Sequence, residues 1–279
     1  MAASLDPQTK IDRAYEHVDA LDSLVQNFSQ EVCRVDMQPA FWTEPIQTAG
    51  AAVIISAEAT DPPSVLWGPI IGDIVHGFRS ALDQLAWALS VDYQSSPPPP
   101  DPIPRDDPWR RIGFPICLNK DGWANAVTQQ LWAVGPALIA DLKALQPFEI
   151  DQHAPDHEPL AVLQELWNID KHRHLHLVNV SVELHDVLFA EAFPGLPEME
   201  FEVVSKRAPG PLVGKTEIGR AQLITRPGGI LASSLPHVGM NPRLAIDVAF
   251  GQGAPAYGGS VLHTLREIGE TVQAIVAAL

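Results

Sequence analysis

The chain has 279 residues with 18 basic and 34 acidic side chains, 26 prolines, 2 cysteines and 46% hydrophobic residues. This length supplies enough apolar residues for a core, and two cysteines cannot form a disulfide framework. The net charge of −16 excludes DNA as an expected partner and argues against RNA, because the chain repels phosphate. No apolar run is long enough to span a bilayer and the N-terminus lacks a signal-peptide pattern, so we expect a cytoplasmic protein without a membrane partner.

Apolar residues at helical spacing predict a long helix at each end of the chain. Asp6 can cap the first, roughly residues 7 to 32, with Pro7 in its first turn. Ser260 can cap the second, which runs to Leu279. Each helix has one apolar stripe, so we expect both to pack in one helical layer.

The middle of the chain combines helices and strands. Two strong helices are predicted at about residues 65 to 89 and 159 to 173, and a weaker helical region at about residues 123 to 145 is broken near Gly135 and Pro136. Strand-like segments bounded by Gly and Pro occupy residues 31–37, 51–57, 175–189, 199–205, 221–225 and 244–250. The later strands follow one another without helices. We therefore expect an α+β fold in which the long N- and C-terminal helices and the two central helices pack on an antiparallel sheet.

One proline-rich segment interrupts this pattern. Residues 95–108 read SSPPPPDPIPRDDP, and proline excludes a helix there and favours an extended conformation. We expect a loop within a single α+β domain that comprises residues 1–279. The alternative is a ligand for a proline-recognition module.

The helix at residues 65–89 carries a polar stripe beside its apolar face. His76, Arg79 and Asp83 recur at three- and four-residue spacing, and the stripe ends at Trp87. Solvent-exposed faces usually carry Lys, Glu and Gln instead. We therefore expect a neighbouring element to cover this stripe.

The helix at residues 159–173 is the candidate neighbour. Asp170 lies at an angle between Leu163 and Leu166, and a carboxylate within an apolar stripe requires a cation. We expect Arg79 to pair with it, because a guanidinium can hold a carboxylate through two bonds. The resulting cluster is either a functional pocket or a buried ion-pair clamp that fixes helix register, and it comprises His76, Arg79, Asp83, Asn168, Asp170, Lys171, His172 and Arg173.

Two segments of these helices, IGDIVHGFRSALDQLAW and NIDKHR, carry a family resemblance. They resemble the signatures I-G-D-x-x-H-N-L-R-S-A-L-D-H-L and N-x-D-K-H-R of a family of uncharacterised bacterial proteins. This chain has Gly77 and Gln84 where that family has Asn and His. The resemblance implies where the site lies, but the family has no established activity to transfer.

The first of these helices is also similar, more loosely, to HEPN domains, which include metal-independent ribonucleases. Their motif is an Arg followed a few residues later by a His, and Gln84 stands at that spacing after Arg79. Glutamine cannot act as a general acid or base. The resemblance therefore implies that the proton-transfer role is lost unless His76 replaces it.

Alternating histidines raise the question of a metal site. His172, His174 and His176 share one face if the chain is extended there, which suits a transition metal, but they diverge if the helix continues. No HExxH motif or paired CxxC motif accompanies them, so we expect no metal. We also expect no cofactor, because Pro209 occupies a position where a phosphate-binding loop needs glycine and no dinucleotide fingerprint is found.

The sequence thus favours an intracellular bacterial protein that binds a small polar ligand or a protein partner at the cluster between the two central helices. One alternative is an enzyme that uses the same cluster, either a HEPN-like ribonuclease or a metal-dependent enzyme. The other alternative is a structural protein in which the cluster is an ion-pair clamp.

Overall fold

The computed structural model describes residues 6–40, 52–59, 61–94, 103, 106–172, 177–183, 200–206, 214–224, 245–251 and 253–279. The helices are α1 (Pro7–Val32), α2 (Trp67–Tyr93), η1 (Pro108–Arg111), α3 (Lys120–Gln129), α4 (Pro136–Ala144), α5 (Pro147–Ile150), η2 (Pro155–His157), α6 (Pro159–His172) and α7 (Val261–Ala278). The strands are β1 (Cys33–Ala40), β2 (Ala52–Ala59), β3 (Leu177–Glu183), β4 (Glu200–Lys206), β5 (Thr216–Ile224) and β6 (Ala245–Phe250). Most of the proline-rich segment lies outside the described residues.

Local sequence signals set the ends of the main helices. The Asp6 carboxylate accepts the backbone N–H of Gln8 at 3.0 Å, and the Ser260 hydroxyl oxygen accepts that of His263 at 3.0 Å. Each bond satisfies a donor that has no partner within the first turn of the helix. Pro136 begins α4 directly after Gly135, which separates this helix from α3. The predicted caps and the predicted break are therefore confirmed.

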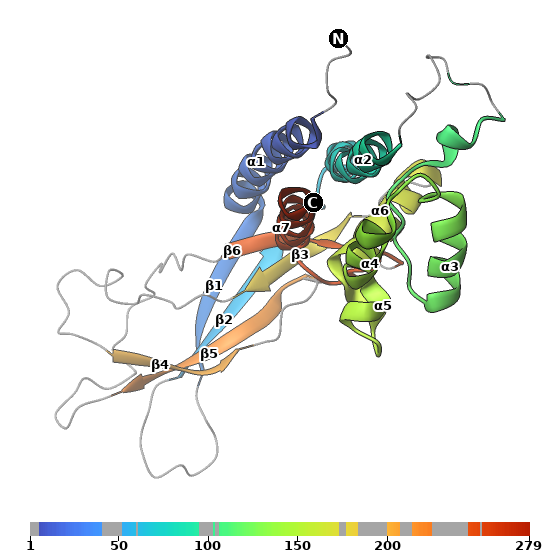
Figure 1. Ribbon diagram of the computed structural model, residues 1–279. Helices are drawn as coiled ribbons and strands as arrows, with labels where there is room; N and C mark the ends of the chain where they lie inside the picture. Colours follow the sequence, from blue (N-terminus) through green and yellow to red (C-terminus); the bar gives the residue numbers. More distant parts are fainter. Residues whose placement is uncertain are drawn as a thin grey trace.

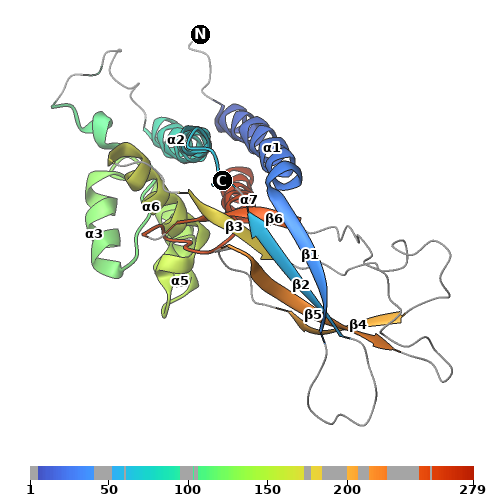
Figure 2. The same cartoon turned by 180° about the vertical axis from the view of Figure 1, so that it is seen from behind.

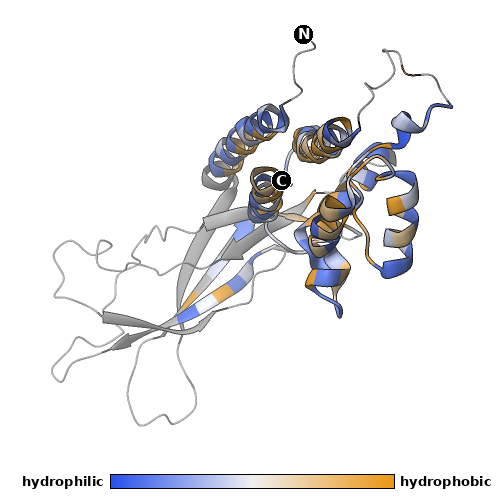
Figure 3. Ribbon diagram, in the orientation of Figure 1, coloured by the Kyte–Doolittle hydropathy of each residue, from blue (hydrophilic) through white to orange (hydrophobic). Residues whose placement is uncertain are grey.

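The core of the described chain is a group of helices. Helix α2 contacts α1, α6 and α7, and α7 also contacts α1 and α6 (Figure 1). Long apolar stretches of α2 and α7 are visible in Figure 3. The facing side chains are fully buried, among them Ile11, Phe78, Leu82, Leu163 and Leu265. Burial of such side chains is the main source of stability in a fold of this kind.

A glycine on α7 allows three helices to meet closely. A Cβ atom at position 269 would lie 2.7 Å both from Phe78 Cζ on α2 and from the Tyr15 hydroxyl on α1. The rings of Tyr15 and Phe78 pack edge to face with their centroids 5.6 Å apart. Gly269 is therefore required for this approach of α7 to the other two helices.

The strands form two separate sheets. Strands β1, β2, β5 and β4, in that order, make a four-stranded sheet, and β3 pairs with β6 in a two-stranded sheet. All of these neighbours pair antiparallel. Strand β6 contacts α1 and α7, whereas the four-stranded sheet extends away from the helices (Figures 1 and 2).

The predicted α+β architecture, with four long helices packed on one antiparallel sheet, is wrong. The apolar faces of the long helices are buried mainly against one another, and the strands are divided between two sheets. Sequence patterns locate segments with strand character but do not select their partners, because pairing depends on contacts with distant segments. Among the described residues, α2 packs against the helices α1, α6 and α7, and its Arg79 side chain contacts Phe114 in the segment that follows η1.

Candidate functional site

Arg79 lies at the junction between α2, α6 and the segment after η1. It is 7% exposed, and its Nη2 donates to Asp83 Oδ1 at 2.9 Å and to the carbonyl oxygen of Phe114 at 2.6 Å. Asp83 Oδ1 also accepts the backbone N–H of Phe114 at 3.0 Å. The two side chains, one helical turn apart on α2, therefore bind both backbone polar groups of Phe114.

The remaining donors of Arg79 have no acceptor. Nη2 uses both of its hydrogens in the two bonds above, whereas Nε and Nη1 are buried without a hydrogen-bond partner. Leaving buried donors of a charged group without acceptors costs free energy, about 1–3 kcal/mol for each buried group. Among the described residues, Arg79 is the side chain with the most buried polar atoms that lack a hydrogen-bond partner.

Helix α6 covers Arg79 with an aromatic ring and a second cation. The Arg79 Cζ atom lies 5.2 Å from the centroid of the Trp167 ring, within range of a cation–π interaction. The ammonium group of Lys171 lies over the same ring. Helix α6 therefore covers Arg79 of the predicted polar stripe, whereas His76 of the same stripe is exposed.

The expected ion pair across this junction is wrong. Both side chains are described, and Arg79 takes Asp83 of its own helix as its carboxylate partner instead of Asp170. Asp170 is exposed, and its carboxylate lies against the α2 backbone at Gly72, where a Cβ atom would overlap it. Asp170 lies in the last turn of α6 and is exposed there, although its position on the helical wheel predicts burial.

The other members of the predicted cluster have separate surroundings. His76 is exposed, and its Nε2 lies 3.3 Å from the Ser80 hydroxyl oxygen. The Asn168 side-chain oxygen accepts from Gln164 Nε2 at 3.2 Å on the same helix. The side chain of His172 and the whole of Arg173, His174 and His176 lie outside the described residues. Within the described residues, no group of three or more His, Cys, Asp or Glu side chains is placed to hold a metal ion.

Burial shifts the ionisation of the paired residues. It raises the pKa of Asp83 above its ordinary value, and the charges of Arg79 and Lys171 and the N–H of Phe114 only partly oppose this effect. It also lowers the pKa of Arg79, which the charge of Asp83 opposes. The pKa of Lys171 is lowered by desolvation first and by the charge of Arg79 second. The two cations are therefore close enough to repel each other.

A pocket of about 380 Å³ opens beside Arg79. Its walls come from the segment after η1, from α3 and from α6, and they include Phe114, Cys117, Asn125, Gln130, Gln164 and Trp167. The amide groups of three of these residues can donate or accept hydrogen bonds. Arg79 is the charged residue of this wall, so the pocket combines a buried cation with polar side chains.

A second pocket adjoins the first one. It has a volume of about 510 Å³ and shares Ile116 and Gln164 with the Arg79 pocket. Its apolar wall residues are Ile116, Leu118, Ala161, Ala254 and Pro255. Asp156 and Glu165 are exposed in its wall.

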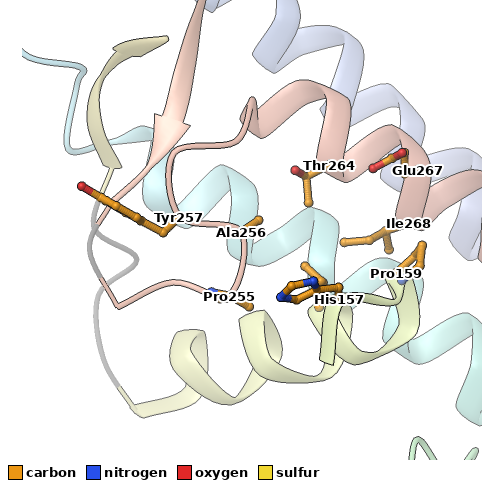
Figure 4. Close-up of a pocket in the computed structure, with 9 residues that line it drawn as sticks. His157, Pro159, Pro255, Ala256, Tyr257, Thr264, Glu267 and Ile268 are labelled. Atoms are coloured by element: carbon orange, nitrogen blue, oxygen red, sulfur yellow. The ribbon is translucent and has the colours of Figure 1, made fainter. Parts of the chain in front are cut away.

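A third pocket of about 270 Å³ lies between the start of α6 and α7. Figure 4 shows His157 on one side of it and Thr264 and Glu267 on α7 opposite, whereas the Tyr257 ring points away. Its polar groups already have partners: Thr264 donates to the Ser260 carbonyl at 2.8 Å, and Glu267 lies 3.3 Å from His263. Thr264 is buried but hydrogen-bonded, and His157 and Glu267 are exposed to solvent, so none of these polar groups is buried without a partner as the Arg79 donors are.

Sequence reasoning missed several residues of the Arg79 pocket. Phe114 contributes its backbone, which no residue pattern reveals, and no local motif marks Cys117 as a pocket residue. Trp167 lies among the apolar residues of its helix in the sequence, although it also stacks on Arg79. Its spacing from Lys171, four residues along the helix, was the available signal.

Comparison of the chain with models of protein families, with curated proteins and with solved structures finds no match. The resemblance to uncharacterised bacterial proteins and to HEPN domains therefore stays a prediction. In the described part of the chain, no helix combines the length and the apolar character needed to cross a bilayer. Gln84, at the HEPN histidine position, is not part of the Arg79 pocket wall, and its side-chain oxygen is buried without a partner.

Proposed function

We propose that the protein binds a small anion, through a carboxylate or phosphate group, in the pocket beside Arg79. The observation that carries this proposal is the set of unpartnered donors on Nε and Nη1 of a buried arginine in a pocket wall. An anionic oxygen is the acceptor that these donors fit best, because hydrogen bonds between charged groups are about twice as strong as neutral ones.

The local charge supports an anion. Arg79 and Lys171 contribute two positive charges to the junction, and Asp83 contributes one negative charge. This excess of positive charge occurs in a chain whose net charge is −16. A local cationic site on an acidic protein attracts a small anion while the rest of the surface repels large polyanions.

Access to the free donors requires a small movement of one side chain. Nε and Nη1 are buried, and the Trp167 ring that stacks on the guanidinium also lines the pocket. We expect rotation of this ring to give an anion access to the donors. Binding should therefore change the fluorescence of Trp167, and a Trp167→Phe variant identifies its share of the signal.

Calorimetric titration with acetate and with inorganic phosphate, at constant ionic strength, tests the proposal. We expect saturable binding of at least one of these anions and a loss of affinity of tenfold or more in Arg79→Met, since a charged hydrogen bond is worth about 1.5–3 kcal/mol. Arg266→Met is the matched control, because Arg266 pairs with Asp22 at the surface and is not part of this pocket wall.

Two results would overturn the proposal. One is a folded wild-type protein that binds neither anion. The other is equal binding by wild type and by an Arg79→Met variant whose circular dichroism shows that it is folded. If Arg79→Met does not fold, Lys171→Met takes its place, and a loss of affinity there is still expected because its charge contributes to the same field.

A further inference from the structure

We infer that the anion is the carboxylate of an amphiphilic monocarboxylic acid whose hydrocarbon part occupies the pocket next to Arg79. This inference rests on the proposed function and names the class of ligand. It follows from the charge at Arg79, from the two wall residues that the pockets share and from the contrast between their walls.

The charge at the first pocket fits a single negative charge. Asp83 already balances one of the two cations, Arg79 and Lys171, so one positive charge remains. A carboxylate carries one negative charge at neutral pH, whereas a phosphate monoester carries about 1.5 to 2. A carboxylate therefore neutralises the site without leaving an excess of negative charge.

The two pockets share part of their walls. Ile116 and Gln164 belong to both walls, so a ligand anchored at Arg79 can extend past them into the second pocket. The first pocket offers amide groups, whereas the second offers the apolar side chains of Leu118, Ala161 and Pro255. A ligand with a charged head and an apolar tail fits this arrangement, with its head in the first pocket and its tail in the second.

The wall of the second pocket disfavours a ligand that carries a second negative charge. Asp156 and Glu165 are exposed in its wall, and no Lys or Arg is part of that wall. A dicarboxylate would bring its far carboxylate toward these two groups, and like charges at short range repel. The tail is therefore expected to be uncharged.

Calorimetry with acetate, butyrate, hexanoate and octanoate, each kept below its micellar concentration, tests the inference. Each added methylene group should tighten binding by about three- to fourfold until the second pocket is filled. Adipate should bind more weakly than hexanoate. In Leu118→Asp the dependence on chain length should disappear while acetate binding is kept, because Leu118 is 47% exposed and contacts only the tail pocket.

Ile150→Asp is the matched control, since Ile150 is 55% exposed and belongs to neither pocket wall. Equal affinities for acetate and octanoate would overturn the inference and leave the proposed function intact. Tighter binding of aminohexanoate than of hexanoate would also overturn it, in favour of a ligand with a cationic tail. Failure of every carboxylate and of phosphate to bind would instead reject the proposed function itself.

Discussion

Asp83 accepts the backbone N–H of Phe114 at 3.0 Å, while Arg79 donates to the carbonyl of the same residue at 2.6 Å. Phe114 is fully buried, so these bonds satisfy backbone groups that would otherwise have no partner in the core. The pair therefore fixes the segment after η1 to α2. That segment is one wall of the Arg79 pocket, and its position depends on both side chains.

Removal of Asp83 should destabilise the protein. In Asp83→Ala, Arg79 remains buried and the N–H of Phe114 loses its acceptor, and we expect a loss of about 2 kcal/mol in the free energy of unfolding. This value lies between those of exposed and buried pairs, because the Asp83 side chain is 37% exposed. Asp83→Asn should lose much less, since an amide oxygen can accept both bonds. Urea unfolding measures these differences.

The coupling between Arg79 and Asp83 can be measured separately. Arg79→Met keeps the length of the side chain but removes its charge and its bond to the Phe114 carbonyl. The double variant Arg79→Met/Asp83→Ala should lose clearly less stability than the sum of the single variants, because both remove the same pair. If the losses of the two single variants add up to that of the double variant, the two side chains do not interact energetically.

The ionisation of Asp83 should make stability depend on pH. Burial raises the pKa of this carboxyl above its ordinary value of 3.8. The folded protein then holds the proton more tightly than the unfolded chain, so the contribution of Asp83 to stability is full below pH 3.8 and is lost as the pH rises through the raised pKa. The free energy of unfolding of wild type, relative to Asp83→Asn, should therefore fall across this window. A relative gain with rising pH would show that the charge of Arg79 outweighs burial.

Much of the local structure could be predicted from the sequence. Helix α1 has the predicted bounds because Asp6, Pro7 and a regular apolar stripe all act within a few residues. The same periodicity locates the polar stripe of α2, of which α6 covers Arg79 but leaves His76 exposed. These features depend on neighbours along the chain, which a sequence displays directly.

The partners of these elements could not be predicted in the same way. A helical wheel gives the angle of Asp170 but not its position along the axis, so the exposure of the last turn of α6 was missed. The bonds to Phe114 use backbone groups, which carry no residue-specific signal. The division of the strands between two sheets depends on pairings such as β2 with β5, which are distant in the sequence.

The close approach of Gly72 and Asp170 gives a steric test of the α2–α6 packing. A Cβ atom at position 72 would lie 2.7 Å from the Asp170 Cγ atom, so Gly72→Ala forces the carboxylate or the helix to move. Overpacking costs about 1–3 kcal/mol and alanine regains about 1 kcal/mol of helix propensity, so we expect a net loss of about 1 kcal/mol.

The same substitution in an Asp170→Ala background provides the control. With the carboxylate absent, Gly72→Ala should be neutral or stabilising, because only the gain in helix propensity remains. Thermal unfolding of the four proteins gives the comparison. A loss of stability that is equal in both backgrounds would mean that Asp170 does not limit the space at Gly72.

Cys117 reports on the Arg79 pocket through its reactivity. Its thiol lines the pocket, the residue is 9% exposed, and burial raises the thiol pKa above its ordinary value of 9.0. Since the thiolate is the reactive form, alkylation by iodoacetamide in a Cys33→Ala variant should be slow at neutral pH and should still accelerate above pH 9.0. The urea-unfolded variant, with an exposed thiol, is the control and should react faster. A rate that levels off below pH 9.0 would show that the positive charge of Arg79 stabilises the thiolate more than burial disfavours it.

The same reaction tests whether the ligand occupies this pocket. If it does, hexanoate should slow the alkylation of Cys117, and half of this effect should be reached at a hexanoate concentration equal to its dissociation constant.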